Sequence, residues 1–332
     1  MENVATSNLN RYTSPHLPMR LFKFGNAERC AGAFCFPTDP DETNAITYYV
    51  DVGDWKMPFK ILRASTRRKP GLLLLHGLGL HPASFRGIAG YLLPVCDLVL
   101  PDYTGFTSTD GWPEGGVSLR MLVHAIMRIP AALGLDQINI GGSSLGGGLS
   151  LMAAVDFPGF IDRIVLFNPA VFPQPLPSFY RLVRVPIVGP LFMFLISSKD
   201  MARGVSTIGY VDSSRLDKEL MQIYEDNMKP SVNRRRLLDL IRYLPQCDTD
   251  IQHFLSYAGK LPQEVLTIWG EQDKLLAAGV AERLRQTLPH NQFHNFPDLS
   301  HLPHEESPDR IGPIVAKFLA ETRPPYQGPA VT

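Results

Sequence analysis

The feature of the sequence best suited to chemistry is a serine set between glycines, in the segment Gly142-Ser143-Ser144-Leu145-Gly146. It contains the pattern G-x-S-x-G with Ser144 at the centre, between a short apolar run and a helical stretch. A serine on such a turn takes strained backbone angles, and the residues two positions away must be small so that the strand and the helix can approach each other. We therefore predict that Ser144 is a nucleophile. Centring the pattern on Ser143 would put Leu145 where a glycine is needed.

A glycine-rich loop before a helix can also bind phosphate. The dinucleotide-binding fingerprint needs glycines at positions i, i+2 and i+5, and no starting residue within 141–148 gives that spacing. The Walker A motif needs a lysine after its last glycine, and none follows Gly148. The loop is therefore interpreted as a nucleophile turn rather than a phosphate-binding loop.

A serine hydroxyl is a weak nucleophile, so it needs a base and a carboxylate that orients the base. On this kind of turn, the acid and then the histidine follow the serine along the chain. The apolar run 265–269 leads into a loop that contains Asp273, and a second short run, 296–300, leads to His301. Asp273 and His301 are the candidates for the two roles.

Neighbouring residues of the same types are alternatives. His294 and His304 flank His301, but neither directly follows the short run and its turn. Glu271 and Asp298 are carboxylates near the two candidates in the sequence. Histidines outside motifs are more often surface or satisfied core residues. Motif position is what favours His301.

These side chains must be positioned by a repeating order of strands and helices. Short apolar runs of the kind that form strands buried on both faces occupy 72–75, 97–100, 137–140, 164–167 and 265–269. A helical pattern covers 118–133, and the β-rich runs 45–52 and 59–64 form a predicted hairpin. Strands alternating with helices predict an α/β protein with a mostly parallel twisted sheet, helices on both faces, and a site at the carboxyl ends of the strands.

Between 170 and 261 the pattern becomes helical, and we expect a helical cap inserted over that edge of the sheet. Ser214 begins an S-x-x-D capping signature, and a second helix follows Pro230-Ser231. The run 234–236, three arginines, is expected to form a solvated helix face. The predicted layout is an N-terminal extension over 1–44, a core over 45–169 and 262–322, the cap over 170–261, and a flexible tail over 323–332.

Four motifs, taken in this order, resemble those of the α/β-hydrolase superfamily over roughly 45–319. They are His76-Gly77-Leu78-Gly79, the Ser144 turn, Trp269-Gly270-x-x-Asp273 and Ser300-His301-x-x-His304-Glu305. The resemblance implies that Ser144 is the nucleophile, that His301 acts as general base and then acid, and that Asp273 orients His301. It also implies that the backbone N–H groups of Leu78 and Leu145 bind the oxyanion, and that His76 braces the loop carrying Leu78.

The sequence differs from the pattern of some or most family members in two places. In some family members the acid follows the preceding core strand, but here that position holds Asn168, which cannot ionise. After Asp102 the family usually has G-x-G-x-S, whereas this chain has Gly105-Phe106-Thr107-Ser108. The second departure affects the expected pocket wall and leaves the three proposed catalytic residues unchanged.

The composition of the chain limits which partners, cofactors and cellular location we expect. The 332 residues carry 32 Lys and Arg against 32 Asp and Glu, so no net field attracts nucleic acid. The four cysteines form no C-x-x-C pair or metal-ligand spacing, and neither a metal nor a cofactor is expected. The first twenty residues lack the apolar core of a signal peptide, and no run reaches the ~18 apolar residues of a membrane span. We expect a cytoplasmic protein.

A serine nucleophile predicts acyl transfer to water, and the apolar cap composition favours a carboxylic ester of a hydrophobic small molecule as substrate. Haloalkane dehalogenases and epoxide hydrolases of this superfamily need a carboxylate at the position of Ser144, so both are disfavoured. Carbon–carbon bond hydrolysis is an alternative, although those relatives usually carry an aromatic residue where Leu302 follows the histidine. Acyl transfer to another acceptor and a non-catalytic binding role are also open.

Overall fold

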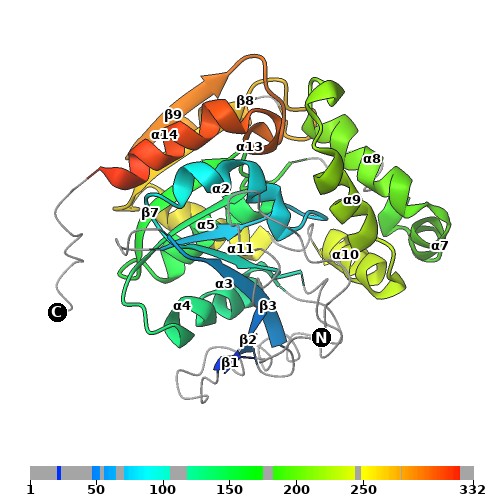
Figure 1. Cartoon of the computed structure of the whole chain (residues 1–332), viewed down its shortest axis with the longest axis horizontal. Helices are drawn as coiled ribbons and strands as arrows, with labels where there is room; N and C mark the ends of the chain where they lie inside the picture. Colours follow the sequence, from blue (N-terminus) through cyan, green and yellow to red (C-terminus); the bar gives the residue numbers. More distant parts are fainter. Residues whose placement is uncertain are drawn as a thin grey trace.

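A nine-stranded sheet forms the centre of the computed structural model, which describes residues 21–23, 47–52, 56–64, 71–104, 118–174, 182–243, 248–277 and 279–321 (Figure 1). The strands are β1 Leu21–Lys23, β2 Thr47–Asp51, β3 Lys56–Leu62, β4 Leu72–Leu75, β5 Leu98–Pro101, β6 Ile138–Ser143, β7 Ile161–Phe167, β8 Glu264–Gly270 and β9 Asn291–Phe296. Their order is β1-β2-β3-β5-β4-β6-β7-β8-β9. The first three are antiparallel to their neighbours and the other six run parallel, which confirms the predicted fold class.

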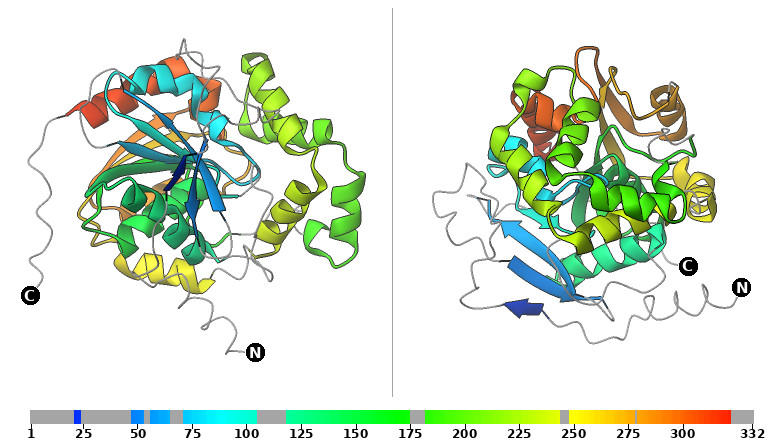
Figure 2. Two further views of the ribbon diagram at one scale, coloured as in Figure 1. Left: turned by 60° about the horizontal axis from the view of Figure 1, so that its bottom comes forward. Right: turned by 90° about the vertical axis from the view of Figure 1, so that its right-hand side faces the viewer.

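Helices cover both faces of this sheet (Figures 1 and 2). They are α2 Arg86–Leu92, α3 Leu119–Ile126, α4 Arg128–Ala132, α5 Leu145–Asp156, α7 Val188–Leu195, α8 Ser198–Gly209, α9 Lys218–Asn227, α10 Ser231–Tyr243, α11 Asp248–Ala258, α12 Val280–Thr287, α13 Pro303–Glu306 and α14 Pro308–Ala320. Two short 3₁₀ turns, η2 Pro82–Phe85 and η3 Ser213–Arg215, complete the described elements.

Strand β4 shows why its sequence is a continuous apolar run. All four of its leucines are fully buried. Side chains alternate along a strand, so Leu73 and Leu75 pack with helices α3, α5 and α11 in one core, whereas Leu72 and Leu74 pack with α2 and α14 in the other. Each such leucine contributes about 1.5–3 kcal/mol by leaving water.

The single helix predicted over 118–133 is broken in two. Helix α3 begins after Ser118, whose side chain accepts a hydrogen bond from the Met121 amide, and it ends at Ile126. Pro130 has no N–H to donate to the carbonyl of Ile126, four residues earlier, so the regular pattern cannot continue there. A short second helix, α4, then follows Met127.

Helices α7 to α10 stand beside the sheet as a separate layer, on the right of Figure 1. In contrast, α11 packs against α5 with the core helices. The expected insertion ran from 170 to 261. We propose that the cap ends before α11, and the rest of the predicted domain layout stays a prediction.

Two local expectations about the cap are wrong. Helix α9 begins at Lys218 rather than near Ser214, because Asp217 caps it by accepting from the amides of Glu219 and Leu220. The arginine run over 234–236 does not form a solvated face as a whole, because only Arg235 is exposed and Arg236 is buried, with 4% of its surface exposed. The Arg234 guanidinium donates to the carbonyls of Met193 and Ile196 on the α7 side of the cap.

Several sequence features fall outside the described residues, namely Cys30, Cys35, Cys247, the Gly105–Ser108 segment and the tail 323–332. Cys96 is buried with a free thiol, and burial raises its pKa to about 12. None of the helices in the described ranges is long and apolar enough to cross a membrane.

Candidate active site

Ser144 lies on a tight turn between β6 and α5, at the carboxyl end of the central strands. Its backbone has φ 52° and ψ −118°, a conformation that is costly for a residue with a side chain. The turn is held by the Ser144 amide, which donates to the Phe167 carbonyl at 3.0 Å. A β-carbon on Gly146 would lie 2.0 Å from the Leu75 carbonyl oxygen, so glycine is required there. The geometry matches the sequence requirement at this turn.

Asp273 and His301 come together at the same edge. Asp273 follows β8, His301 follows β9, and His301 Nδ1 lies 2.7 Å from Asp273 Oδ2. The other carboxylate oxygen accepts from the amides of Leu275 and Leu276 at 2.8 and 2.9 Å. Burial alone would raise the pKa of Asp273, but the nearby His301 charge and these hydrogen bonds hold that pKa below its usual value. The carboxylate is therefore ionised at neutral pH and fixed in orientation.

Asn168 is a site residue whose contacts the sequence did not reveal. It is fully buried after β7, with φ 40°, and its Nδ2 donates to Asp273 Oδ2 at 2.7 Å. Nδ2 also donates to the Gly270 carbonyl, and Oδ1 accepts from the Gly270 amide. Asn168 thus fastens the loop after β8 to the end of β7. The sequence feature that points to this role is the position of Asn168 directly after a buried strand.

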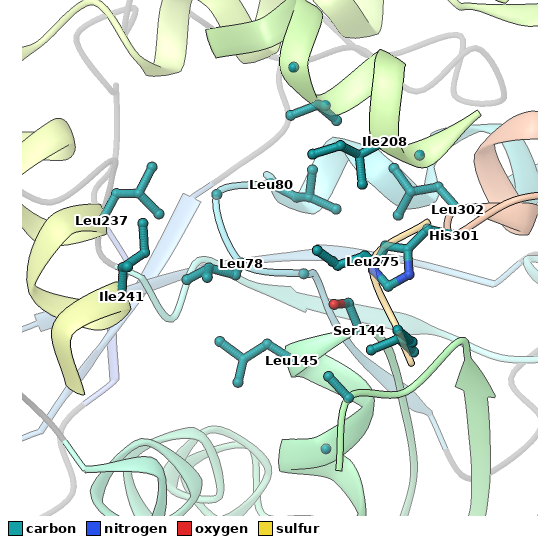
Figure 3. Close-up of a pocket in the computed structure, with 18 of the residues that line it drawn as sticks. Leu78, Leu80, Ser144, Leu145, Ile208, Leu237, Ile241, Leu275, His301 and Leu302 are labelled. Carbon is teal, nitrogen blue, oxygen red and sulfur yellow. The ribbon is translucent and has the colours of Figure 1, made fainter. Parts of the chain in front are cut away.

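Ser144 and His301 line one cavity of about 600 Å³ at this edge (Figure 3). His301 is 4% exposed, and its Nε2 has no hydrogen-bond partner, so no such bond joins it to Ser144 in this structure. Catalytic hydrogen bonds are often formed only when substrate is bound. Leu237 and Ile241 of α10 lie on the opposite side of the cavity in Figure 3.

Leu78 and Leu145 also line the cavity, next to the Ser144 turn. Leu145 is the first residue of α5, so its amide has no acceptor within the helix. The Leu78 amide makes no backbone hydrogen bond within the described ranges. His76 precedes this loop, fully buried, with its ring stacked on Tyr103 at 4.5 Å and the Tyr103 hydroxyl donating to its carbonyl. The residue that begins this loop is therefore anchored through both its ring and its carbonyl.

The alternative acids and bases lie elsewhere. His294 and Glu271 are exposed, and Asp298 is exposed and bound to Arg310. His304 is fully buried between the rings of Phe85 and Phe167, and burial lowers its pKa to about 3. None of these four side chains belongs to the described cavity wall.

Two carboxylates just after His301 tie the cap to the core. Glu305 is buried and accepts hydrogen bonds from Ser84 of the core and from the hydroxyls of Tyr210 and Tyr224 of the cap. Burial raises its pKa. Glu306 accepts from the amides of Ser300, Val211 and Asp212. The sequence offered no sign of the contacts with the cap, since they join residues 81 to 95 positions apart.

No group of three or more His, Cys, Asp or Glu side chains in the described part of the chain is arranged to hold a metal ion.

Comparisons with known proteins agree with this architecture. A family model described as alpha/beta hydrolase fold matches residues 70–188. The chain is 26% identical over 264 residues to a 2-hydroxymuconate semialdehyde hydrolase of Pseudomonas putida, which covers 75% of this chain and 86% of that enzyme.

Solved structures give the same picture. A serine hydrolase from the polyaromatic hydrocarbon-degrading bacterium Cycloclasticus zankles superposes with a TM-score of 0.69 at 21% identity, covering 82% of this chain and 96% of that one. A haloalkane dehalogenase from Bradyrhizobium elkani reaches 0.71 at 18% identity, covering 83% and 98%. These likenesses concern the fold, because the neighbours differ in chemistry. The chain therefore has the α/β-hydrolase fold, and the family model and the sequence relatives support its place in the α/β-hydrolase superfamily.

Proposed function

We propose that this protein is a serine hydrolase that cleaves carboxylic esters of hydrophobic small molecules through an acyl-enzyme. Ser144 is the nucleophile, His301 the general base and then acid, and Asp273 the carboxylate that holds His301 in orientation. The hydrogen bond from His301 Nδ1 to Asp273 supports this assignment, because it leaves Nε2 free to exchange a proton with the serine.

The reaction has two halves. Ser144 Oγ attacks the ester carbonyl carbon while His301 Nε2 takes the hydroxyl proton, and the oxyanion is bound by the amides of Leu78 and Leu145. The ester C–O bond then breaks, and the alcohol leaves with the proton from His301. Water next attacks the acyl-enzyme, its proton passing through His301 back to Ser144 as the acid departs. Each oxyanion donor contributes about 3 kcal/mol to the transition state.

The apolar wall of the cavity is the observation that supports a hydrophobic substrate. On the core side it is formed by α3, α5 and α11, with Leu119, Met152 and Phe254. On the cap side it is formed by α7 to α10, with Met193 and Leu237 among others. A volume of about 600 Å³ suits a drug-sized apolar ligand. The lining favours an uncharged hydrophobic ester over a sugar or a peptide.

The proposal is tested with a fluorophosphonate probe and a series of p-nitrophenyl esters of increasing acyl length. We expect covalent labelling at Ser144 and kcat/KM that rises with chain length before the cavity is full. Ser144→Ala should abolish labelling and lower kcat by about 10⁴ to 10⁶. Ser143→Ala is the matched control, because it removes the adjacent buried hydroxyl and should leave labelling intact. Labelling that survives Ser144→Ala would refute the assignment.

Hydrolysis of a carbon–carbon bond beside a carbonyl is the second candidate, and the likeness to the P. putida enzyme favours it. The substrate named for the P. putida enzyme is a muconate derivative and therefore carries a carboxylate. A carboxylate buried in a protein needs a cationic partner. Among the described wall residues, Arg184 is the one Lys or Arg. Arg184 is half-buried and makes no ion pair with the described residues, so it could bind the carboxylate of such a substrate.

A third outcome concerns a protein without catalytic activity. Absence of probe labelling at neutral pH would favour a non-catalytic binding protein.

A further inference from the structure

The exposed large apolar side chains gather on one segment of the cap. Of the eleven such residues in the described ranges, seven lie within 182–195: Leu182, Val185, Ile187, Val188, Leu191, Phe194 and Leu195. Ile187, Phe194 and Leu195 are 82%, 77% and 70% exposed. Scattered apolar residues are normal on a surface, but a contiguous group marks an interaction site.

The helix that carries this surface is firmly packed on its other side. Met193 is 3% exposed and lines the active-site cavity together with Ile196. Arg234 of α10 donates hydrogen bonds to the carbonyls of both residues. Helix α7 is thus held in place as a wall one helix thick, with the cavity on one side and exposed apolar residues on the other. It lies at the outer edge of the cap, far from the sheet (Figures 1 and 2).

Positive charge accompanies the apolar face, although the whole chain is neutral. The segment 182–196 contains no acidic residue. Lys199, at the start of α8, and Arg235, on α10, are exposed, and neither lies within ion-pair distance of a described carboxylate, although the charges of Asp200 and Asp239 are close enough to interact with them. Both elements adjoin α7, by chain connection for α8 and by packing for α10. Apolar side chains flanked by exposed cations are the combination that binds anionic lipid surfaces.

We propose that the outer face of α7 docks on the surface of a lipid assembly with anionic headgroups. Phe194, Leu195 and Ile187 enter the boundary between headgroups and acyl chains, and Lys199 and Arg235 contact the headgroups. Helix α7 has eight residues, so it lies on such a surface and cannot span it. Because the inner side of the same helix lines the cavity, docking brings this wall of the cavity close to apolar molecules dissolved in the lipid.

A second copy of the chain is the competing occupant of this face. A two-fold contact uses the same surface on both subunits, so it would bring Lys199 and Arg235 of each copy to one interface. That arrangement places exposed cations near one another, whereas anionic headgroups attract them. The charge pattern therefore favours the lipid surface.

The test measures co-sedimentation of the full chain with vesicles of phosphatidylcholine alone or mixed with phosphatidylglycerol. We expect binding that is about fivefold or more stronger to the anionic vesicles. The double variant Phe194→Asp, Leu195→Asp should lose about tenfold or more in binding. Tyr257→Asp, which charges another exposed aromatic residue on α11, is the matched control and should bind as the unmodified chain does.

Two further measurements keep the test decisive. Lys199→Glu with Arg235→Glu should remove the preference for anionic vesicles, and this variant tests the proposal even where the aspartate variant fails to fold. Ser144→Ala should bind vesicles normally, because docking does not depend on the chemistry proposed for the site. Failure of the unmodified chain to bind either vesicle overturns the proposal. The proposal is also overturned if light scattering shows that the unmodified chain is a dimer that binds no vesicles, and that the Phe194→Asp, Leu195→Asp variant is a monomer.

Discussion

Asn168→Gly should separate the positioning of Asp273 from the stability of the fold. Glycine tolerates the positive φ of 40° at this position, so the change removes hydrogen bonds without adding backbone strain. Three bonds are lost, two to the Gly270 backbone and one to the Asp273 carboxylate. With about 1 kcal/mol for each neutral bond and about 1.5–3 kcal/mol for the bond to a charged group, we expect a loss of about 3–5 kcal/mol in the free energy of unfolding.

The same change should reduce catalysis beyond its effect on folding. Without the Asn168 donor, the carboxylate that orients His301 is less tightly fixed, and we expect kcat for a p-nitrophenyl ester to fall by about 10- to 100-fold with little change in KM. The assay is run at a temperature where circular dichroism shows the variant folded.

Thr267→Val provides a matched control for this prediction. Thr267 is fully buried on β8, and its hydroxyl donates to Asn291 of β9 at 2.9 Å, away from the cavity wall. Its loss should cost about 1 kcal/mol of stability and leave kcat unchanged. A folded Asn168→Gly protein with normal kcat would show that its bond to Asp273 serves the fold and has no part in catalysis.

The remaining predictions concern three other features. Gly146→Ala should prevent correct folding, seen as loss of the cooperative thermal transition, since its β-carbon would lie 2.0 Å from a carbonyl oxygen, whereas Gly159→Ala has open space and should melt normally. Burial raises the pKa of Glu305 above 4.5, so the folded state takes up a proton more readily than the unfolded chain, and unfolding free energy should rise as the pH falls from that raised value toward 4.5. Denaturant titrations of Glu305→Gln should lack this rise, and an unchanged profile would contradict the assignment. Arg184→Met should leave hydrolysis of uncharged esters unaltered, and a loss confined to carboxylate-bearing substrates would favour the carbon–carbon alternative.

The strands that carry the candidate site were predictable because each is encoded locally. The run 72–75 coincides with β4, the runs at 164–167 and 265–269 lie within longer strands, and the run at 137–140 overlaps the first three residues of β6. Parallel strands end at one edge, so residues placed just beyond them had to meet there. Asp273 and His301 illustrate this rule, because they lie within hydrogen-bonding distance of each other although 28 residues separate them in the sequence.

Other features depend on contacts that no local pattern contains. Strand β9 is an edge strand in which four of the six residues are polar and only Phe296 is buried, so it lacks the apolar run that marks the buried strands. Arg236 is buried in the cap although its sequence surroundings are those of a solvated helix. The capping residue of α9 could be chosen only by geometry, since Ser214 and Asp217 both fit a capping role by type.

The cap is fastened to the segment that carries His301, and this shapes how substrate and base are aligned. Glu305 and Glu306 lie four and five residues after His301 and accept hydrogen bonds from the end of α8 and from α9. The Leu302 amide donates to the Gly209 carbonyl, where a β-carbon would lie 2.6 Å from the leucine side chain. The part of the cavity wall built from α8 is therefore tied directly to the segment that carries His301, and Asp273 and Asn168 hold that histidine at the end of the sheet. Hydrogen bonds thus connect the α8 wall, the proposed base and its carboxylate in one set, so a change at Glu305 or Glu306 should affect the position of His301 as well as that of the cap.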